Sequence, residues 1–189
     1  MSEAAVHDPP GPSHRRERFE EVFDTHREAV LGYLLRRTGS SHDAADLLAD
    51  TFVVAWRRLD EVPAGDQTKP WLYGVARRVL ANHRRGEGRR NALADRLRDE
   101  LVETTTPSPE PLDSDSATAQ AFRALPEADR ELLTLVAWED LDTAQIATVL
   151  RCSRNAVRIR LHRARKRFAK LLTTRPPVTV RGEVSHEDI

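Results

Sequence analysis

Residues 142–172 limit the possible folds of this chain more than any other segment does. Asp142 is a residue type that favours a helix N-cap, and a glutamine stands three positions later, which is a variant of the capping box. Only Arg151 and Cys152 remain for a turn before Ser153, which can cap a second helix. In that helix the apolar residues recur at spacings of four, three, four and three, which predicts one buried stripe: Val157, Leu161, Ala164, Phe168 and Leu171. The segment therefore predicts two helices joined by a very short turn.

Outside this stripe, the second helix is basic on nearly every side. Its cationic residues are Arg154, Arg158, Arg160, Arg163, Arg165, Lys166, Arg167 and Lys170. No acidic residue occurs between Asp142 and Glu183, although like charges three or four residues apart repel each other on a helix. A face of one sign favours a polyanionic partner, and a basic second helix behind a tight turn suits the major groove of DNA. The alternative is a basic surface helix without a partner.

The composition favours an all-α protein with small cores. Among the 189 residues, 30 are basic and 30 are acidic, so the formal net charge is +0 and the charges lie in blocks of one sign. Aromatic residues make up only 5% of the chain, and alternating Val, Ile and Thr residues are scarce. The single cysteine, Cys152, excludes an intrachain disulfide and a multi-cysteine zinc site, and we interpret it as a packed small side chain.

No segment of the sequence suggests membrane insertion, secretion or catalysis. No stretch approaches the ~20 apolar residues that a membrane span needs, and residues 1–12 contain no apolar run of the signal-peptide type. The sequence contains no glycine-rich phosphate loop, no metal-ligand spacing and no nucleophile with a placed base. We therefore expect a cytoplasmic protein without enzyme activity, cofactor or metal.

Two helices are predicted near the N-terminus, at residues 18–37 and 43–59, after a disordered arm at residues 1–14. Ser40 or Ser41 can cap the second of them. The inward stripe of that helix would consist of Leu48, Phe52, Ala55 and Leu59.

On the second helix, a row of acidic residues lies apart from this stripe. Asp43, Asp46 and Asp50 follow one another at spacings of three and four, with no basic residue on the row to offset their repulsion. The row is either a solvated face or a docking surface for a basic partner. We place Trp56, on the same helix, in the core.

A third helix has Pro70 in its first turn, runs to about Arg85 and ends before Gly86. Its basic patch contains Arg77, Arg78, Arg84 and Arg85. Basic residues bind phosphates and aromatic side chains can stack on unpaired bases, although core packing is the alternative for Trp71 and Tyr73.

Three motifs, in this order and spacing, carry a resemblance to a known family. They are DAADLLADTFVVAW at residues 43–56, KPWLYGVARRVLANHRR at residues 69–85, and the segment from LPEADR to RARKRF at residues 125–168. Together they resemble a bacterial RNA polymerase sigma factor of the sigma-70 family, in the extracytoplasmic-function (ECF) group, also called group four. The resemblance covers residues 19–172, which is most of the chain.

The resemblance implies an all-α chain with two small helical domains. Sigma domain two would span residues 15–90 and sigma domain four residues 117–172. A flexible acidic linker at residues 91–116 would join them, and a tail at residues 173–189 would follow. The implied function is to direct core RNA polymerase to specific promoters and to assist promoter melting. An anti-sigma factor is a further expected partner.

The resemblance also implies three sets of site residues. Domain two would dock on the clamp helices of the largest polymerase subunit through Asp43, Asp46, Leu47, Asp50 and Thr51. The −10 promoter element would be bound by Asp66, Gln67, Trp71, Arg77, Arg78, Arg84 and Arg85. The −35 element would be bound by Ser153, Arg154, Asn155, Arg158, Arg160, Arg163 and Lys166, and domain four would contact the flap of the second-largest subunit. In the −35 set, Arg154, Asn155 and Arg158 are best placed for base edges.

Three residues depart from the family pattern. Arg78 stands where asparagine is common, Asn82 where an acid is common, and Arg151 where the turn usually has glycine. Either the turn avoids a positive φ at Arg151, or Arg151 adopts it at a cost in return for a phosphate contact. Two other functions stay open from the residues alone: a stand-alone helix-turn-helix regulator of transcription, and a helical adaptor without a DNA role.

Overall fold

The computed structural model describes residues 12–98 and 116–173, and all regular structure within these two ranges is helical. The elements are α1 (Pro12–Thr38), α2 (Ser41–Arg57), the 3₁₀ turns η1 (Leu59–Glu61) and η2 (Gly65–Gln67), α3 (Thr68–Arg98), α4 (Ala117–Arg123), α5 (Glu127–Ala137), α6 (Thr143–Leu150) and α7 (Arg154–Thr173). The predicted all-α class is therefore confirmed. Part of the predicted linker is helical, since residues 91–98 belong to α3 and Ser116 caps α4. Residues 99–115 of the linker lie outside the described residues, as do residues 1–11 of the predicted arm and 174–189 of the tail.

Helices α1, α2 and α3 form an N-terminal domain around one apolar core. Gly39 adopts a φ of +71° after α1, and the Ser40 hydroxyl then accepts a hydrogen bond of 3.2 Å from the Asp43 amide, which caps α2. The α1 and α2 helices meet through aromatic side chains, with the Phe23 and Phe52 rings in an edge contact at 4.8 Å between centroids. The buried stripe of α2 contains Ala44, Leu47, Thr51, Phe52 and Ala55.

Several local predictions for this domain are wrong, for identifiable reasons. Helix α1 begins at Pro12 and not near residue 18, and α3 continues through Gly86 to Arg98. A glycine inside a helix costs only about 1 kcal/mol, so without a capping arrangement it does not end one. Trp56, predicted in the core, is 41% exposed: its ring meets that of Phe19 at 5.1 Å between centroids, and the Arg15 guanidinium lies 5.5 Å from its centre. The predicted inward stripe of α2 is confirmed, since Leu48 is half-buried against the core and Phe52, Ala55 and Leu59 are buried.

Helices α4 to α7 form a C-terminal domain in which the predicted caps are present. The Asp142 carboxylate accepts hydrogen bonds from the Ala144 and Gln145 amides at 2.6 and 2.8 Å, and these bonds lower its pKa. The Gln145 side chain in turn accepts from the Asp142 amide at 3.0 Å, which completes the capping box. The Ser153 hydroxyl caps α7 by accepting from the Ala156 amide at 3.2 Å.

The apolar stripe of α7 is also confirmed. Val157, Leu161 and Ala164 are buried, while Phe168 and Leu171 are half-buried toward the helix end. Trp138 caps the C-terminal end of α5 and is 56% exposed, with its ring 5.6 Å from that of Phe122 between centroids. Its exposure does not affect the helix-turn-helix, which has its own stripe.

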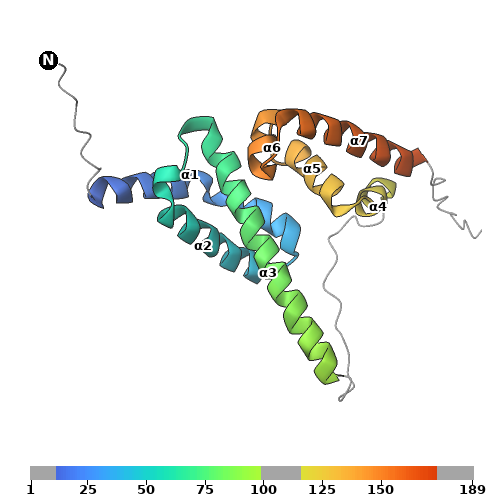
Figure 1. Cartoon of the computed structure of the whole chain (residues 1–189), viewed down its shortest axis with the longest axis horizontal. Helices are drawn as coiled ribbons and strands as arrows, with labels where there is room; N and C mark the ends of the chain where they lie inside the picture. The colour runs from blue at the N-terminus through green and yellow to red at the C-terminus, as the bar shows by residue number, and fades with distance from the viewer. Residues whose placement is uncertain (1–11, 99–115, 174–189) are drawn as a thin grey trace, which may run out of the picture.

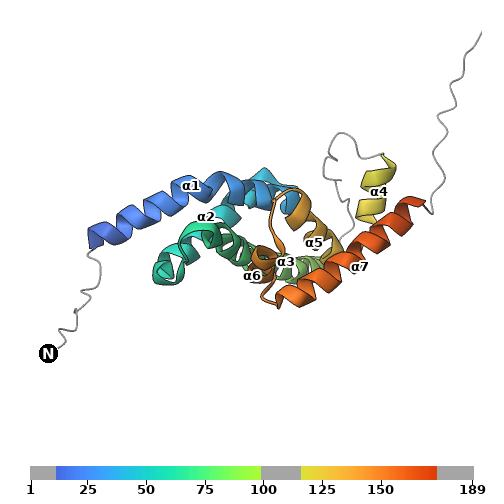
Figure 2. The ribbon, with the colours of Figure 1, turned by 90° about the horizontal axis from the view of Figure 1, so that it is seen from above.

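The two domains pack against each other and share one continuous apolar core. Figure 1 shows α3 running along the junction, with α1 and α2 on one side and the C-terminal domain on the other; Figure 2 shows α6 against α3 from above. Gly74 of α3 faces Val149 of α6: a Cβ built on Gly74 would lie 3.5 Å from the carbonyl oxygen of Val149, an ordinary van der Waals contact. This contact was not predicted.

The turn of the helix-turn-helix contains one residue with an unusual backbone conformation. Arg151 ends α6 with φ 51° and ψ 51°, the left-handed conformation. A side chain with a Cβ is strained there, whereas glycine is not. The strain in the native chain therefore falls on a residue in the short turn that precedes α7.

We predict that Arg151→Gly raises the free energy of unfolding by about 1 kcal/mol, because it relieves this strain. Urea denaturation monitored by circular dichroism measures the change. Arg165→Gly is the matched control: Arg165 lies inside α7 with helical geometry, so glycine there lowers stability by about 1 kcal/mol. A loss of stability for both variants contradicts the strain at Arg151.

Candidate nucleic-acid interface and the domain junction

The predicted −35 residues form an exposed basic surface along the first turns of α7. All seven are exposed: Ser153, Arg154, Asn155, Arg158, Arg160, Arg163 and Lys166. The helix-turn-helix fixes their orientation, because Val157 and Leu161 anchor the opposite face of α7 in the core. Arg154 also donates from Nε to the Thr143 hydroxyl at 3.1 Å, which ties the start of α7 to the start of α6.

Two further side chains belong to this surface and were not assigned from the sequence. Ile159 and His162 line a shallow hollow of α7 together with Asn155, Arg158 and Arg163. Ile159 is 45% exposed, and an apolar side chain on a basic helix can contact the methyl group of thymine. The signal was available in the sequence, since Ile159 lies off the buried stripe formed by Val157 and Leu161.

The predicted −10 residues lie in η2 and along α3, and they differ in their exposure to solvent. Asp66, Gln67, Arg77, Arg84 and Arg85 are exposed, whereas Trp71 and Arg78 are half-buried. Arg85 donates to the Asn82 side chain, one of the departures from the family pattern. Tyr73 is 1% exposed, so core packing is the correct interpretation of that residue.

Arg78 meets the other unusual arginine across the junction. Partial burial and the neighbouring cations Arg151 and Arg58 lower the pKa of the Arg78 guanidinium. The Arg58 guanidinium also lies 5.6 Å from the centre of the Trp71 ring. The turn of the helix-turn-helix therefore approaches the basic side of α3 closely enough for like charges to interact.

Helix α6 covers the η2 turn, where two of the predicted −10 residues lie. The Thr148 hydroxyl donates to the Gln67 side-chain oxygen at 3.3 Å, and the Gln145 amide donates to the Asp66 carbonyl oxygen at 3.4 Å. Arg84 is held as well, since it donates to Glu127 and, at 2.8 Å, to the Arg37 carbonyl oxygen. In this arrangement the C-terminal domain occupies groups that could bind DNA.

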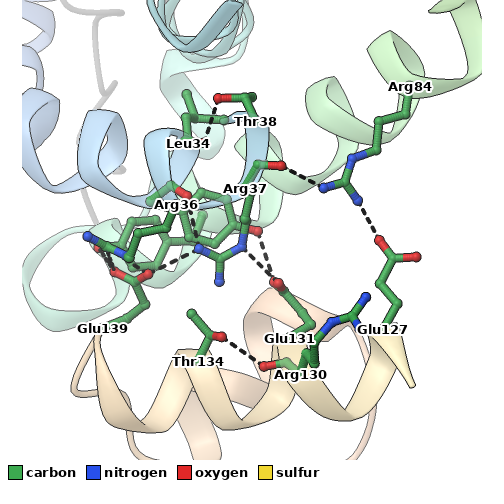
Figure 3. A network of polar contacts seen from close by, with 12 residues as sticks. Leu34, Arg36, Arg37, Thr38, Arg84, Glu127, Arg130, Glu131, Thr134 and Glu139 are labelled. Carbon is green, nitrogen blue, oxygen red and sulfur yellow. Dashed lines mark hydrogen bonds and ion pairs between the residues drawn. The ribbon is translucent and has the colours of Figure 1, made fainter. Parts of the chain in front are cut away.

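A buried carboxylate, Glu139, forms the centre of the junction. It is 2% exposed and follows α5 in the C-terminal domain, yet the groups that bond to its side chain come from the N-terminal domain. Figure 3 shows two of them, Arg36 and Arg37. Arg36 donates to both of its oxygens at 2.9 and 2.7 Å, and Arg37 donates at 3.2 Å. The Tyr73 hydroxyl donates to it at 3.0 Å, and Lys69 donates to its backbone oxygen at 2.9 Å.

A second carboxylate, Glu131, extends the junction along α5. It accepts from Arg37 Nε at 2.8 Å and from the Tyr33 hydroxyl at 3.0 Å. The Tyr33 ring stacks on Tyr73 with centroids 4.8 Å apart, and the Arg37 guanidinium lies 3.6 Å from the centre of the Tyr33 ring. Burial first, and then the adjacent carboxylates Glu131 and Glu139, raise the pKa of the Tyr33 and Tyr73 phenols, so both are neutral donors at neutral pH.

The predicted polymerase-docking residues on α2 divide into two groups. Asp46 and Asp50 are exposed, and Asp43 is half-buried beside the Ser40 cap. Leu47 and Thr51, however, are 1% and 0% exposed, and the Thr51 hydroxyl bonds to the Leu47 carbonyl oxygen at 2.7 Å. These two side chains are part of the core and do not form a surface, because their spacing of four places them on the inward face of α2.

The described part of the chain offers few other chemical groups. It has no cluster of His, Cys, Asp and Glu side chains that could hold a metal ion, and Cys152 is a half-buried free thiol. Within the same residues, no helix combines the length and the apolar character that crossing a bilayer requires.

Comparisons with known proteins agree with the motifs quoted above. The family described as Sigma-70 region 2 matches residues 22–90, and that described as Sigma-70, region 4 matches residues 116–168. The chain is 30% identical over 165 residues to the RNA polymerase sigma-H factor of Pseudomonas aeruginosa, covering 82% of this chain and 86% of that protein. It is also 30% identical over 147 residues to the ECF RNA polymerase sigma factor SigL of Mycobacterium tuberculosis, covering 76% and 82%. These relatives favour a sigma factor over a stand-alone regulator.

The fold is also similar to that of a solved complex. The sigma factor RpoE, in complex with the anti-sigma factor NepR from Bartonella quintana, superposes with a TM-score of 0.62. The match has 22% sequence identity and covers 85% of this chain and 99% of that one.

We predict that Glu139→Gln loosens the domain junction, because the variant leaves Arg37 buried with less negative charge around it. Losing one partner of a fully buried pair costs roughly 3–5 kcal/mol, and we expect less here because Arg36 is 36% exposed. Small-angle X-ray scattering should show a larger radius of gyration, with unchanged helical content by circular dichroism.

Asp129→Asn is the matched control for this experiment. Asp129 pairs with Arg167 inside the C-terminal domain, so its loss removes an ion pair without touching the junction. An equal expansion of both variants, or of neither, contradicts the role given to Glu139.

Proposed function

This chain belongs to the ECF group of the sigma-70 family of RNA polymerase sigma factors, and from that premise we propose how it selects promoters. It binds core polymerase through the N-terminal domain and the flap through the C-terminal domain. It then reads the −35 element with α7 and the −10 element with η2 and α3, and assists melting there. It acts by positioning polymerase, without chemistry of its own, in the cytoplasm where polymerase works.

One observation supports this proposal most directly: α7 presents a uniformly basic, exposed face behind a capped turn. Arg158 and Asn155 lie beside Ile159 on this face, which provides donors for guanine and adenine edges and an apolar contact for thymine. Arg160, Arg163 and Lys166 provide the phosphate contacts that fix the helix in the groove.

Promoter reading requires the two domains to separate. While α6 lies on η2, the Gln67 side chain and the Asp66 backbone oxygen are bonded to α6, and Arg84 is paired with Glu127. We propose that polymerase holds the domains apart, so that the surfaces for the −10 and −35 elements both become free only in the assembled enzyme. An anti-sigma factor, as in the Bartonella quintana complex, would act by preventing this separation.

The docking surface for the clamp helices would be the exposed side of α2. Asp46 and Asp50 supply negative charge, and Val53 supplies an apolar contact with 46% of its surface exposed. Exposed ion pairs are individually weak, about 0.2–1 kcal/mol, so several must act together with the apolar contact.

We predict that core polymerase transcribes a cognate promoter only when this protein is added, and that the double variant Asp46→Lys with Asp50→Lys abolishes this. The reversed charges should weaken binding to core enzyme at least about tenfold, while circular dichroism stays unchanged. In vitro transcription and co-purification measure the two effects.

The control carries the same change on α1, with Asp24→Lys and Glu28→Lys, since both residues are exposed and one turn apart. Specific transcripts from the Asp46 and Asp50 variant at the level of the control would refute the docking surface. Specific DNA binding without any effect on core polymerase would refute the proposed function itself.

We predict different effects for two substitutions on α7. Arg158→Ala should cost about 1–3 kcal/mol of discrimination at one base pair, because a base-edge contact is lost. Lys166→Ala should weaken binding to all promoter sequences alike and reduce the salt dependence of binding by about one ion. Binding of the polymerase holoenzyme to promoter variants at several salt concentrations separates the two outcomes; identical profiles would contradict the assignment.

A further inference from the structure

A cavity of about 380 Å³ lies at the junction, between α1, α3, α4 and α5. Tyr33 and Leu80 line it from the N-terminal domain, and Phe122 and Thr134 from the C-terminal domain. Its volume falls in the range of small-molecule sites, and its walls combine apolar surface with a few charged groups. Neither domain alone forms this cavity.

The charged groups of the cavity are predominantly cationic. Five arginines line it, Arg36, Arg37, Arg77, Arg84 and Arg130, against two glutamates, Glu127 and Glu131. Arg130 donates to the carbonyl oxygens of Arg123 and Leu125 at 2.6 and 2.8 Å, which leaves its charge uncompensated. Among the described residues no carboxylate lies within ion-pair distance of Arg77, although Arg77 is close enough to Tyr33 to influence its phenol.

One guanidinium nitrogen in this wall has no acceptor. The Arg37 side chain is 7% exposed; its Nε and Nη1 atoms bond to Glu131, Glu139 and the Tyr33 carbonyl oxygen, but its Nη2 atom is buried without a partner among the described residues. Figure 3 shows this nitrogen pointing from α1 toward α5. Buried donors without an acceptor are rare in proteins, and a bound water or ion is one of their explanations.

We propose that this cavity binds a small organic phosphate. The phosphate oxygens accept from Arg37 Nη2 and from Arg77, since a guanidinium fork matches phosphate geometry, after a small shift of side chains that uncovers the buried nitrogen. The organic part of the ligand packs on the apolar wall formed by Leu80 and Phe122.

Such a ligand stabilises the closed arrangement of the two domains. It touches both domains at once, so it binds the closed state and shifts the population toward it. The closed state keeps η2 under α6, and Arg77 and Arg84 are also the arginines expected to hold promoter phosphates. The ligand therefore opposes promoter reading by competing for the same guanidinium groups.

The test is equilibrium binding to the full-length chain, with ADP and pyrophosphate as probes at matched ionic strength. We expect saturable binding of ADP, tighter than that of pyrophosphate because only ADP reaches the apolar wall. Arg77→Gln should weaken ADP binding about tenfold, the worth of one charge-assisted hydrogen bond. Arg27→Gln is the control, since Arg27 is exposed on α1, pairs with Asp24 and does not line the cavity.

Four outcomes overturn the proposal, and the first three concern the two probes and the arginine variants. The first is that neither probe shows saturable binding. The second is that Arg77→Gln and Arg27→Gln weaken ADP binding equally. The third is that pyrophosphate binds as tightly as ADP, which would mean that the organic part of the ligand makes no contact with the apolar wall. Glu139→Gln, which opens the junction but keeps Arg77, should lose most of the binding, and full retention would place the site elsewhere. No polymerase or promoter enters these measurements, so their failure is distinct from failure of the proposed function.

Discussion

A carboxylate that is removed from water must be neutralised by groups placed around it, and in this protein the groups around Glu139 belong to the other domain. Arg36, Arg37 and Tyr73 surround its side chain, and Lys69 binds its backbone oxygen. The cost of burying the charge is offset only while the two domains are together. The packing of the two domains against each other therefore depends on a contact that is made between domains and not within one.

Because of this dependence, the junction is stable while the domains are packed together, and partial separation costs free energy. Removing α5 from α1 would expose Glu139 to water, which is favourable for a carboxylate, but would also uncover the buried Tyr33 and Tyr73 rings. The open form consequently needs a partner that covers these surfaces. A large assembly such as polymerase, which binds both domains at separate points, meets that requirement.

The same cations have two possible sets of anionic partners. Arg84 is paired with Glu127 in the closed arrangement and is expected to hold promoter phosphates in the open one. Arg78 and Arg151, the two arginines at unusual positions for the family, interact electrostatically with each other and both with the Glu61 carboxylate, whose pKa is lowered by its hydrogen bond from Arg58 and further by these two cations. The balance between domain packing and nucleic-acid binding thus rests on how a few guanidinium groups are shared.

The sequence by itself determined that the chain is helical, the caps of α6 and α7 and the buried face of α7. The Asp142 capping box and the stripe through Val157 and Leu161 follow from spacings of a few residues, which act locally along the chain. The sequence left two conformations open at Arg151, and the structure shows the left-handed one. Only the tertiary structure decided which side chains of α2 are buried and which acids meet which cations. Glu139 and Arg36 are 103 residues apart, and no local spacing specifies a pair that forms only when two separately patterned domains pack together.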